Sequence, residues 1–192
     1  MPTLYIIAGP PGIGKSTNAK RIIPTNIEIL NHDLINTAYK YQNIKNYEER
    51  ANIRANAFIK ENLNANANFG VELNLGFESH YDFIRWVRKN SPHYQISVFL
   101  FFTDDIQICL DRALLRAQAG GHLVEPDVIK KMYQDTIYLL RENIKMVNQL
   151  QFINITYDTN RLVYSGYYPN KKLDFIETNL PNWITDKFSE LL

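Results

Sequence analysis

A glycine-rich stretch near the N-terminus has the residue types and spacing of a phosphate-binding loop. It matches the pattern G-x-x-x-x-G-K-S/T at every fixed position. Glycines let backbone N–H groups turn toward a phosphate chain, and the helix that follows presents its positive N-terminal end to the same anion. In this pattern the lysine reaches the β- and γ-phosphates of ATP, and the serine hydroxyl faces Mg²⁺. The candidate residues are Gly9, Pro10, Pro11, Gly12, Ile13, Gly14, Lys15, Ser16 and Thr17.

The segments on both sides of this loop fit a strand and a helix. An extended apolar run, Leu4 to Ala8, precedes the loop, and a helical pattern from Ser16 to Ile22 follows it. Pro10 and Pro11 would stiffen the entry to the loop, because proline fixes the backbone angle φ. The simpler alternative is a Gly-Pro turn that precedes a lysine by chance. The strand-loop-helix context favours the phosphate-binding interpretation.

The composition is that of an ordinary globular protein. The chain has 192 residues, of which 45% are hydrophobic, and a formal net charge of +1. Proteins that bind mainly to the phosphate backbone of nucleic acids carry an excess of positive charge, and this chain is nearly neutral. Nucleic acid is therefore not the expected partner. No apolar run is long enough to span a bilayer and no signal-peptide pattern is present, so we expect no membrane association and a cytoplasmic location.

The cysteine content points to the same compartment. Cys109 is the only cysteine, which excludes an internal disulfide and favours a reducing environment. It lies among apolar residues in a helical pattern, and we expect it to fill part of the core.

Apolar runs that alternate with helical patterns predict an α/β fold. Strands that alternate with helices behind such a loop form a parallel sheet with right-handed crossovers. The expected fold is a P-loop NTPase three-layer sandwich with a central, mostly parallel five-stranded sheet and a helical lid. No linker or repeat divides the chain, so residues 1–192 are expected to form a single domain. We expect strands at residues 3–8, 27–30, 71–77, 96–102 and 152–157, a short hairpin at 161–168, and a closing helix at 183–191.

Two carboxylates follow predicted strands and are candidates for the group that orients an attacking hydroxyl. Asp33 comes after the second predicted strand, and Glu78 comes after the third. Ligands of open α/β sheets bind at the carboxyl ends of strands, and a carboxylate there can accept the proton of a hydroxyl. Both have structural alternatives. Asp33, with Asn31, could cap a helix that begins at Leu34, and Glu78 could lie at a solvated strand end.

Two arginines could stabilise the negative charge that develops during phosphoryl transfer. Arg112 and Arg116 lie one turn apart on a predicted helix that ends at the double glycine 120–121. A double glycine between two helices is typical of a hinge, so we expect a lid that closes over the nucleotide. Arginine suits this role because its planar guanidinium binds phosphate oxygens in pairs. The alternative is that both arginines pair with Asp111 or Asp105 on a solvated face.

The segment at residues 120–133 resembles the lid of the zeta-toxin-like P-loop kinases. It reads Gly-Gly-His-Leu-Val-Glu-Pro-Asp-Val-Ile-Lys-Lys-Met-Tyr and is similar to the family element G-G-H-x-I/V-P-x-x-x-I-x-R-R-Y/F. Three shorter segments are also similar: Asn31-His32-Asp33 resembles an N-x-D element, Phe77-Glu78-Ser79 an F-E-T element, and Tyr157-Asp158-Thr159-Asn160 a Y-D-N-S turn. The similarity extends from the loop to about residue 165.

This resemblance implies transfer of the γ-phosphate of ATP to a hydroxyl, with UDP-N-acetylglucosamine as the acceptor in characterised relatives. It implies that Asp33 is the catalytic base, that Arg112 and Arg116 contact phosphate from a lid at about residues 104–133, and that Asp158 lies near the adenine. If the chain is a toxin, an antitoxin protein is implied as its partner.

The chain departs from the family pattern at three places. Lys130 and Lys131 stand where the lid has paired arginines, and lysine keeps the charge but lacks the planar fork. The order Glu125-Pro126 differs from the usual P-E order, and Ser79-His80 replaces two threonines. The last change lies near the expected acceptor pocket and bears most on the substrate.

The sequence therefore predicts an Mg²⁺- and ATP-dependent kinase that phosphorylates an alcohol group of a small molecule, such as a sugar nucleotide. The candidate catalytic residues are Lys15, Asp33, Glu78, Arg112 and Arg116. One alternative is a kinase of nucleic-acid ends, but the basic residues are scattered rather than gathered into a groove. Another is a nucleotide-binding partner protein without catalysis. The presence of all the candidate catalytic residues argues against this alternative.

Overall fold

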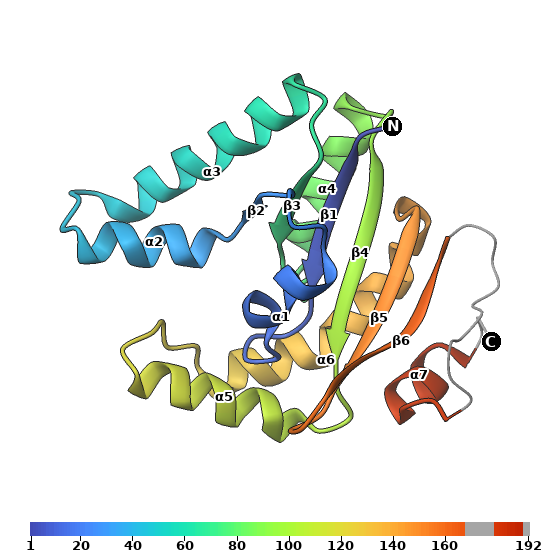
Figure 1. The fold of residues 1–192 in the computed structure, drawn as a ribbon. Helices are drawn as coiled ribbons and strands as arrows, with labels where there is room; N and C mark the ends of the chain where they lie inside the picture. The colour runs from blue at the N-terminus through green and yellow to red at the C-terminus, as the bar shows by residue number, and fades with distance from the viewer. Residues whose placement is uncertain (168–178, 190–192) are drawn as a thin grey trace.

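A six-stranded sheet runs through the centre of the protein in the order β2-β3-β1-β4-β5-β6 (Figure 1). The computed structural model describes residues 1–167 and 179–189. Strands β1 to β5 pair with one another in parallel, and the edge strand β6 pairs antiparallel with β5. The strands are β1 (Thr3–Ala8), β2 (Ile29–Leu30), β3 (Phe69–Glu72), β4 (Gln95–Phe102), β5 (Gln149–Ile155) and β6 (Asn160–Tyr167).

Helices cover both faces of this sheet, so the predicted three-layer α/β sandwich of the P-loop NTPase type is confirmed. In Figure 1, α1 lies in front of the sheet and α4 lies behind it. No helix in the described part of the chain is both long enough and apolar enough to cross a membrane. The helices are α1 (Lys15–Ile22), α2 (His32–Tyr41), α3 (Tyr47–Asn64), α4 (Glu78–Asn90), α5 (Ile106–Gln118), α6 (Pro126–Glu142), the 3₁₀ helix η1 (Ile144–Met146) and α7 (Asn182–Lys187).

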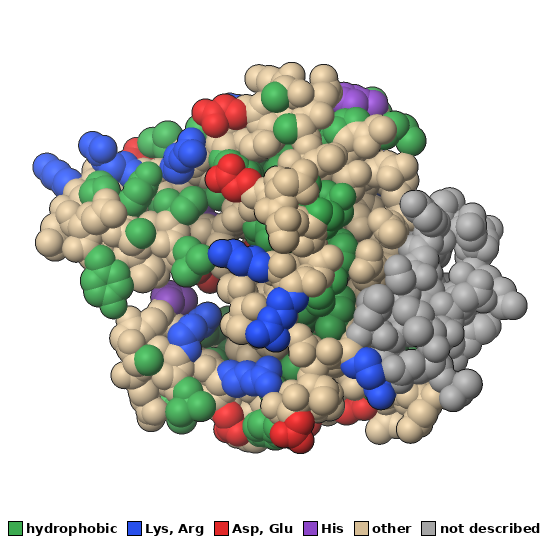
Figure 2. All heavy atoms as spheres, viewed as in Figure 1, with side chains coloured by type: hydrophobic (Ala, Val, Ile, Leu, Met, Phe, Trp, Pro, Cys, Tyr) green, Lys and Arg blue, Asp and Glu red, His purple; other side chains and the backbone are tan. Residues whose placement is uncertain are grey.

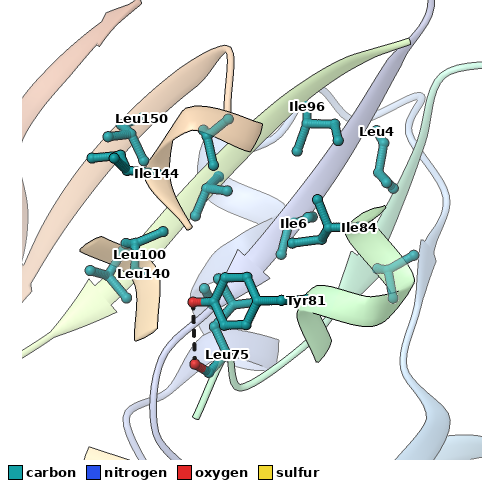
Figure 3. Close-up of a cluster of buried hydrophobic side chains, with 14 of the residues drawn as sticks. Leu4, Ile6, Leu75, Tyr81, Ile84, Ile96, Leu100, Leu140, Ile144 and Leu150 are labelled. Carbon is teal, nitrogen blue, oxygen red and sulfur yellow. Dashed lines mark hydrogen bonds between the residues drawn. The ribbon is translucent and has the colours of Figure 1, made fainter. Parts of the chain in front are cut away.

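Alternating side chains of β1 enter two separate cores. Leu4 and Ile6 belong to the larger core, which α4, α6 and α7 cover, while Ile7 belongs to the smaller core beneath α1 and α5. Figure 3 shows part of the larger core, where Tyr81 of α4 donates a hydrogen bond to the Leu75 carbonyl oxygen at 3.4 Å. Because successive side chains of a strand point to opposite faces, the continuous apolar run is what a sheet covered on both sides requires.

Two expectations about strands are wrong. The sheet has six strands rather than five, because β6 pairs with β5 along its length instead of folding into a hairpin of its own. The third strand ends at Glu72 rather than at residue 77, since its neighbour β1 ends at Ala8 and the last paired residues are Ile7 and Glu72. A strand cannot continue as a ladder beyond its hydrogen-bonding partner.

Two helical units stand on either side of the carboxyl ends of the central strands. Helices α2 and α3 form an arm that projects from the sheet, and α5 lies opposite it (Figure 1). The segment 119–125 connects α5 to α6, and Pro126 occupies the first turn of α6 as predicted. In this arrangement the phosphate-binding loop, between β1 and α1, lies between the arm and α5.

Candidate active site

The loop between β1 and α1 needs glycine at the positions where other chain segments approach it. Gly12 has a φ of 81°, and a Cβ atom there would lie 2.1 Å from the Cys109 carbonyl oxygen of α5. Gly9 has a φ of 132°, and its Cβ would lie 2.2 Å from the Phe101 carbonyl oxygen of β4. Any side chain at either position would collide with backbone, so the loop conformation depends on these two glycines.

Lys15 points back into the loop and is buried. Its Nζ donates hydrogen bonds to the carbonyl oxygens of Gly9 at 2.8 Å and Pro10 at 3.0 Å, and to Oδ1 of Asn74 at 2.7 Å. Burial lowers the pKa of Lys15 from its ordinary value, while the nearby carboxylate of Glu72, 4.0 Å away, acts to raise this pKa. The ammonium group is thus held by two backbone carbonyl oxygens and one amide oxygen, beside the carboxylate of Glu72.

Ser16 lies against a carboxylate that the sequence analysis did not select. Its hydroxyl donates to Oε2 of Glu72 at 2.9 Å, and Nδ2 of Asn31 donates to the same carboxylate oxygen at 2.7 Å. Asn31 Nδ2 also lies 3.2 Å from the Ser16 hydroxyl oxygen, to which it donates. A hydroxyl and a carboxylate in contact offer the hard oxygen ligands that Mg²⁺ prefers, so this pair fits a magnesium ion.

Glu72 and Asn74 were missed because the sequence analysis placed the end of the third strand too late. Glu72 is the last residue of β3, and its side chain is 16% exposed. Beyond it the chain turns at Leu75, a buried residue with a φ of 56° that non-glycine residues seldom adopt. A signal was available, because Glu72 is the first acidic residue after the apolar start of this strand.

Asp33 lies in the first turn of α2 and faces the same cleft as the phosphate-binding loop. The helix cap is Asn31, whose Oδ1 accepts a hydrogen bond from the Leu34 backbone N–H at 3.1 Å. The capping alternative therefore applies to Asn31 and leaves the carboxylate of Asp33 exposed. This carboxylate lies close enough to Lys15 to favour the charged form of the lysine.

Glu78 does not line the cleft. It begins α4 and forms an ion pair with Arg85, with 2.6 Å between Oε1 of Glu78 and Nη2 of Arg85, and its side chain is 59% exposed. Because β3 ends at Glu72, the five residues between them carry Glu78 away from the strand end. The expected position of Glu78 at the end of a strand is therefore wrong.

Arg112 and Arg116 both line the cleft. Arg112 donates to the Ile13 carbonyl oxygen of the loop at 3.3 Å and to the Thr156 carbonyl oxygen after β5 at 3.1 Å. Arg116 donates to the His122 carbonyl oxygen at 3.2 Å.

Neither arginine pairs with the two aspartates proposed as alternatives. Asp105 caps α5 by accepting from the Gln107 backbone N–H, and Asp111 accepts hydrogen bonds from the Gln107 amide and the Tyr157 hydroxyl. The hydrogen bonds of both guanidinium groups go instead to backbone carbonyl oxygens around the cleft.

These residues surround one cleft with a volume of about 700 Å³. Its walls combine three cations, Lys15, Arg112 and Arg116, with two carboxylates, Asp33 and Glu72. Figure 2 shows Lys and Arg side chains gathered on the face that carries α1 and α5, around the hollow that separates α5 from the α2–α3 arm. Cations beside a helix N-terminus provide the electrostatic environment that a polyphosphate needs.

A smaller cavity of about 250 Å³ adjoins the cleft on the side of β5 and β6. Asp158 lines it, together with Tyr157 of the same turn and Gly14 of the loop. Gly14 and Arg112 border both cavities, so a ligand whose phosphates occupy the loop can extend into this one. The nearness of Asp158 to the adenine stays a prediction.

A bound metal ion would need ligands from the nucleotide as well as from the protein. Among the residues that the structure describes, no three His, Cys, Asp or Glu side chains lie close enough to form a metal site by themselves. Mg²⁺ in nucleotide sites is held by one or two protein ligands together with phosphate oxygens and water.

No protein-family model matches the chain, and no curated protein matches its sequence significantly. Solved structures match its fold. The AvrRxo1-ORF1:ORF2 complex with ATP aligns with a TM-score of 0.64 and 15% identity, over 86% of this chain and 58% of that chain. The same complex with sulphate ions aligns with a TM-score of 0.70 and 14% identity, over 100% and 65%. The PezAT toxin-antitoxin system of Streptococcus pneumoniae aligns with a TM-score of 0.64 and 16% identity, over 100% and 82%.

The chain therefore has the fold of the zeta-toxin-like P-loop kinases, which confirms at the level of fold the resemblance inferred from the lid segment. It spans 58% to 65% of the AvrRxo1 chains that it matches. At these identities the comparisons establish the fold, and the chemistry is inferred from the site.

Proposed function

We propose that the protein is an ATP- and Mg²⁺-dependent kinase that transfers the γ-phosphate of ATP to a hydroxyl group of a small molecule. The observation that carries this proposal is the cleft in which Lys15, Ser16, Arg112 and Arg116 face Asp33. Phosphoryl transfer needs a phosphate cradle, charge stabilisation and a group that orients the attacking oxygen, and these residues supply all three.

In the proposed reaction, Lys15 binds the β- and γ-phosphates, and Arg112 and Arg116 stabilise the charge on the transferred group. Asp33 orients the acceptor hydroxyl and accepts its proton while the hydroxyl oxygen forms a bond to the γ-phosphorus. The bond from the γ-phosphorus to the β–γ bridging oxygen breaks, and ADP leaves with its electron pair. Ser16 and Glu72 would hold Mg²⁺, which neutralises phosphate charge when bound.

A sugar nucleotide such as UDP-N-acetylglucosamine is the acceptor that we propose to test first. Support comes from the resemblance in the lid segment and from the shared fold with PezAT. An antitoxin partner enters this proposal only if the chain inhibits cell growth when it is expressed alone.

The decisive experiment is incubation of the protein with a metabolite extract and ATP carrying ¹⁸O in the γ-phosphate, followed by mass spectrometry. We expect at least one species to gain a labelled phosphate. The Lys15→Ala variant should produce none, because it lacks the cation that binds the β- and γ-phosphates. If no species gains the label although the protein binds ATP, the kinase proposal is wrong.

A further inference from the structure

The ammonium group of Lys15 has no proton left over for a phosphate. A lysine carries three hydrogen-bond donors and no acceptor. All three donors are used within the protein, by the carbonyl oxygens of Gly9 and Pro10 and by Oδ1 of Asn74. The shortest of the three hydrogen bonds, at 2.7 Å, is the one to Asn74. A β- and a γ-phosphate oxygen can therefore both bind Lys15 only if it gives up two of these partners.

The surroundings of the three partners decide which of them Lys15 gives up first. Gly9 and Pro10 are buried and do not line the cleft, whereas Asn74 is partly buried and lines it. A buried carbonyl oxygen that loses its donor cannot turn to water, and this carries a large penalty in free energy. The amide of Asn74 lies at the cleft wall, where water can replace the lysine. Asn74 is therefore the partner whose release costs least.

The two carbonyl oxygens also differ from each other. The carbonyl oxygen of Pro10 accepts a second hydrogen bond, from the Ile13 backbone N–H at 3.4 Å, so it keeps a donor when Lys15 leaves. Lys15 can thus exchange Asn74 and Pro10 for two phosphate oxygens while it stays bonded to Gly9. In this exchange no buried carbonyl oxygen loses its last donor.

The backbone of Asn74 is fixed by contacts that do not involve its side chain. Its carbonyl oxygen accepts hydrogen bonds from the Gly9 backbone N–H at 3.4 Å and from the Thr136 hydroxyl of α6 at 3.3 Å. The next residue, Leu75, is fully buried. The amide is therefore presented to Lys15 from a fixed position, although the two residues are 59 positions apart in the sequence.

We propose that Asn74 is a positioning residue that holds Lys15 while the site is empty and competes with the phosphates for it. This proposal rests on the proposed kinase function, in which Lys15 binds the β- and γ-phosphates. ATP binding breaks the hydrogen bond between Asn74 and Lys15, and release of the nucleotide restores it. Because this hydrogen bond stabilises only the empty protein, Asn74 weakens ATP binding and favours release of ADP after transfer.

Affinity measurements test the sign of this effect. Asn74→Leu replaces the amide by an apolar side chain of similar size, so Lys15 loses this partner. The Kd for ATP should fall about 10-fold, the effect of one hydrogen bond that only the empty protein makes. The KM for the substrate that receives the phosphate should not change. If Asn74 instead aligned Lys15 and stayed bonded to it, its loss would weaken ATP binding. A Kd that rises or stays the same therefore overturns the proposal.

A second set of variants shows whether Asn74 acts through Lys15. In Lys15→Met no ammonium group remains for Asn74 to hold. Adding Asn74→Leu to Lys15→Met should therefore leave the Kd for ATP as it is in Lys15→Met alone. A tighter Kd in the double variant would mean a structural effect and would overturn the proposal. The exposed Asn64 of α3 gives the control Asn64→Leu, which should leave the Kd for ATP unchanged.

Crystal structures of the unsubstituted protein provide a test that does not depend on the folding of a variant. With a non-hydrolysable ATP analogue bound, Nζ of Lys15 should lie beyond hydrogen-bonding distance of Oδ1 of Asn74 and remain bonded to Gly9. A hydrogen bond to Asn74 that is retained in this complex would overturn the proposal. The labelled-phosphate experiment tests the kinase function separately. If ATP binds but no species gains phosphate, the kinase function is wrong, and the structures still decide the role of Asn74.

Discussion

At the scale of single residues, the site depends on a buried lysine that is surrounded by hydrogen-bond acceptors. Lys15 has three hydrogen-bond acceptors, and the carboxylates of Glu72 and Asp33 also favour its charged form. Burial is the larger effect and lowers its pKa below the ordinary 10.5. Phosphate oxygens would add negative charge beside the ammonium group, so bound ATP should raise this pKa again.

This difference in pKa predicts how ATP affinity changes with pH. Because ATP binds the protonated lysine better, affinity should be highest below the pKa of the free protein and should fall as the pH rises through it. Calorimetric measurement of the Kd for ATP between about pH 7 and about pH 10 would show this decline. In Lys15→Arg the guanidinium does not titrate in this range, so any remaining ATP affinity should be nearly constant. A constant affinity in the unsubstituted protein would contradict the prediction.

Asp33 makes a separate prediction, because its proposed role concerns transfer and not ATP binding. Asp33→Asn keeps the shape of the side chain but removes the proton acceptor, so phosphate transfer should fall by about 10²- to 10⁴-fold. The Kd for ATP should change little. Glu78→Gln serves as a control, since Glu78 is paired with Arg85 outside the cleft and its substitution should leave transfer nearly unchanged. Normal phosphate transfer by the Asp33→Asn variant would show that Asp33 is not the catalytic base.

At the scale of elements, the phosphate-binding loop and α5 are packed backbone against backbone. Gly12 lies under the Cys109 carbonyl of α5, the helix that also carries Arg112 and Arg116. The buried Cys109 is core filler as expected, and burial raises the pKa of its thiol to about 12. The position of the arginines beside the loop is thus determined by the contact between loop and helix.

A matched pair of glycine substitutions isolates this contact. Gly12 and Gly120 have similar φ angles, 81° and 84°, so alanine should strain the backbone at both positions by a similar amount. Only at Gly12 would the added Cβ also collide with backbone; at Gly120 the nearest atom is the Tyr41 hydroxyl at 3.5 Å. Gly12→Ala should therefore cost about 1–3 kcal/mol more in unfolding free energy and weaken ATP binding. Thermal unfolding and ATP titration of both variants check this, and equal losses would contradict it.

At the scale of the whole molecule, the described C-terminal residues 179–189 complete the larger core, and none of them lines the cleft. Trp183 and Phe188 of this segment pack on Phe152, with ring centroids 5.3 Å and 4.8 Å away. Asp104 accepts hydrogen bonds from the backbone N–H groups of Asn182 and Trp183 at the start of α7. This segment therefore contributes side chains to the larger core and none to the lining of the cleft.

This separation predicts a variant that loses stability without losing its site. Phe188 is fully buried, so Phe188→Ala should lower the free energy of unfolding by about 3–5 kcal/mol. Below the unfolding transition, the Kd for ATP should be unchanged, because none of the residues lining the cleft belongs to this segment. The neighbouring exposed Lys187 gives the control Lys187→Ala, which should affect neither property. A large change in ATP affinity in Phe188→Ala would show that the two regions are coupled.

The parts of the fold that follow from local patterns could be predicted from the sequence. The strand before the loop, the helix after it and the start of α6 at Pro126 each follow from a few neighbouring residues. The end of β3 could not be predicted in this way, because it is determined by where β1 stops pairing with it. For the same reason the sequence pointed to Glu78 and missed Glu72, which lies six residues earlier in the chain.

The sequence by itself determined the phosphate-binding loop, since its glycines, lysine and serine act over nine consecutive residues and need only their own backbone. Which side chains face that loop was decided by the tertiary structure. Asn31 and Glu72 meet Ser16 because β2, β3 and β1 are neighbours in the sheet, although they are separated in the chain. The physical reason is that parallel strands pair across long crossovers, so their carboxyl ends come together only in the folded sheet.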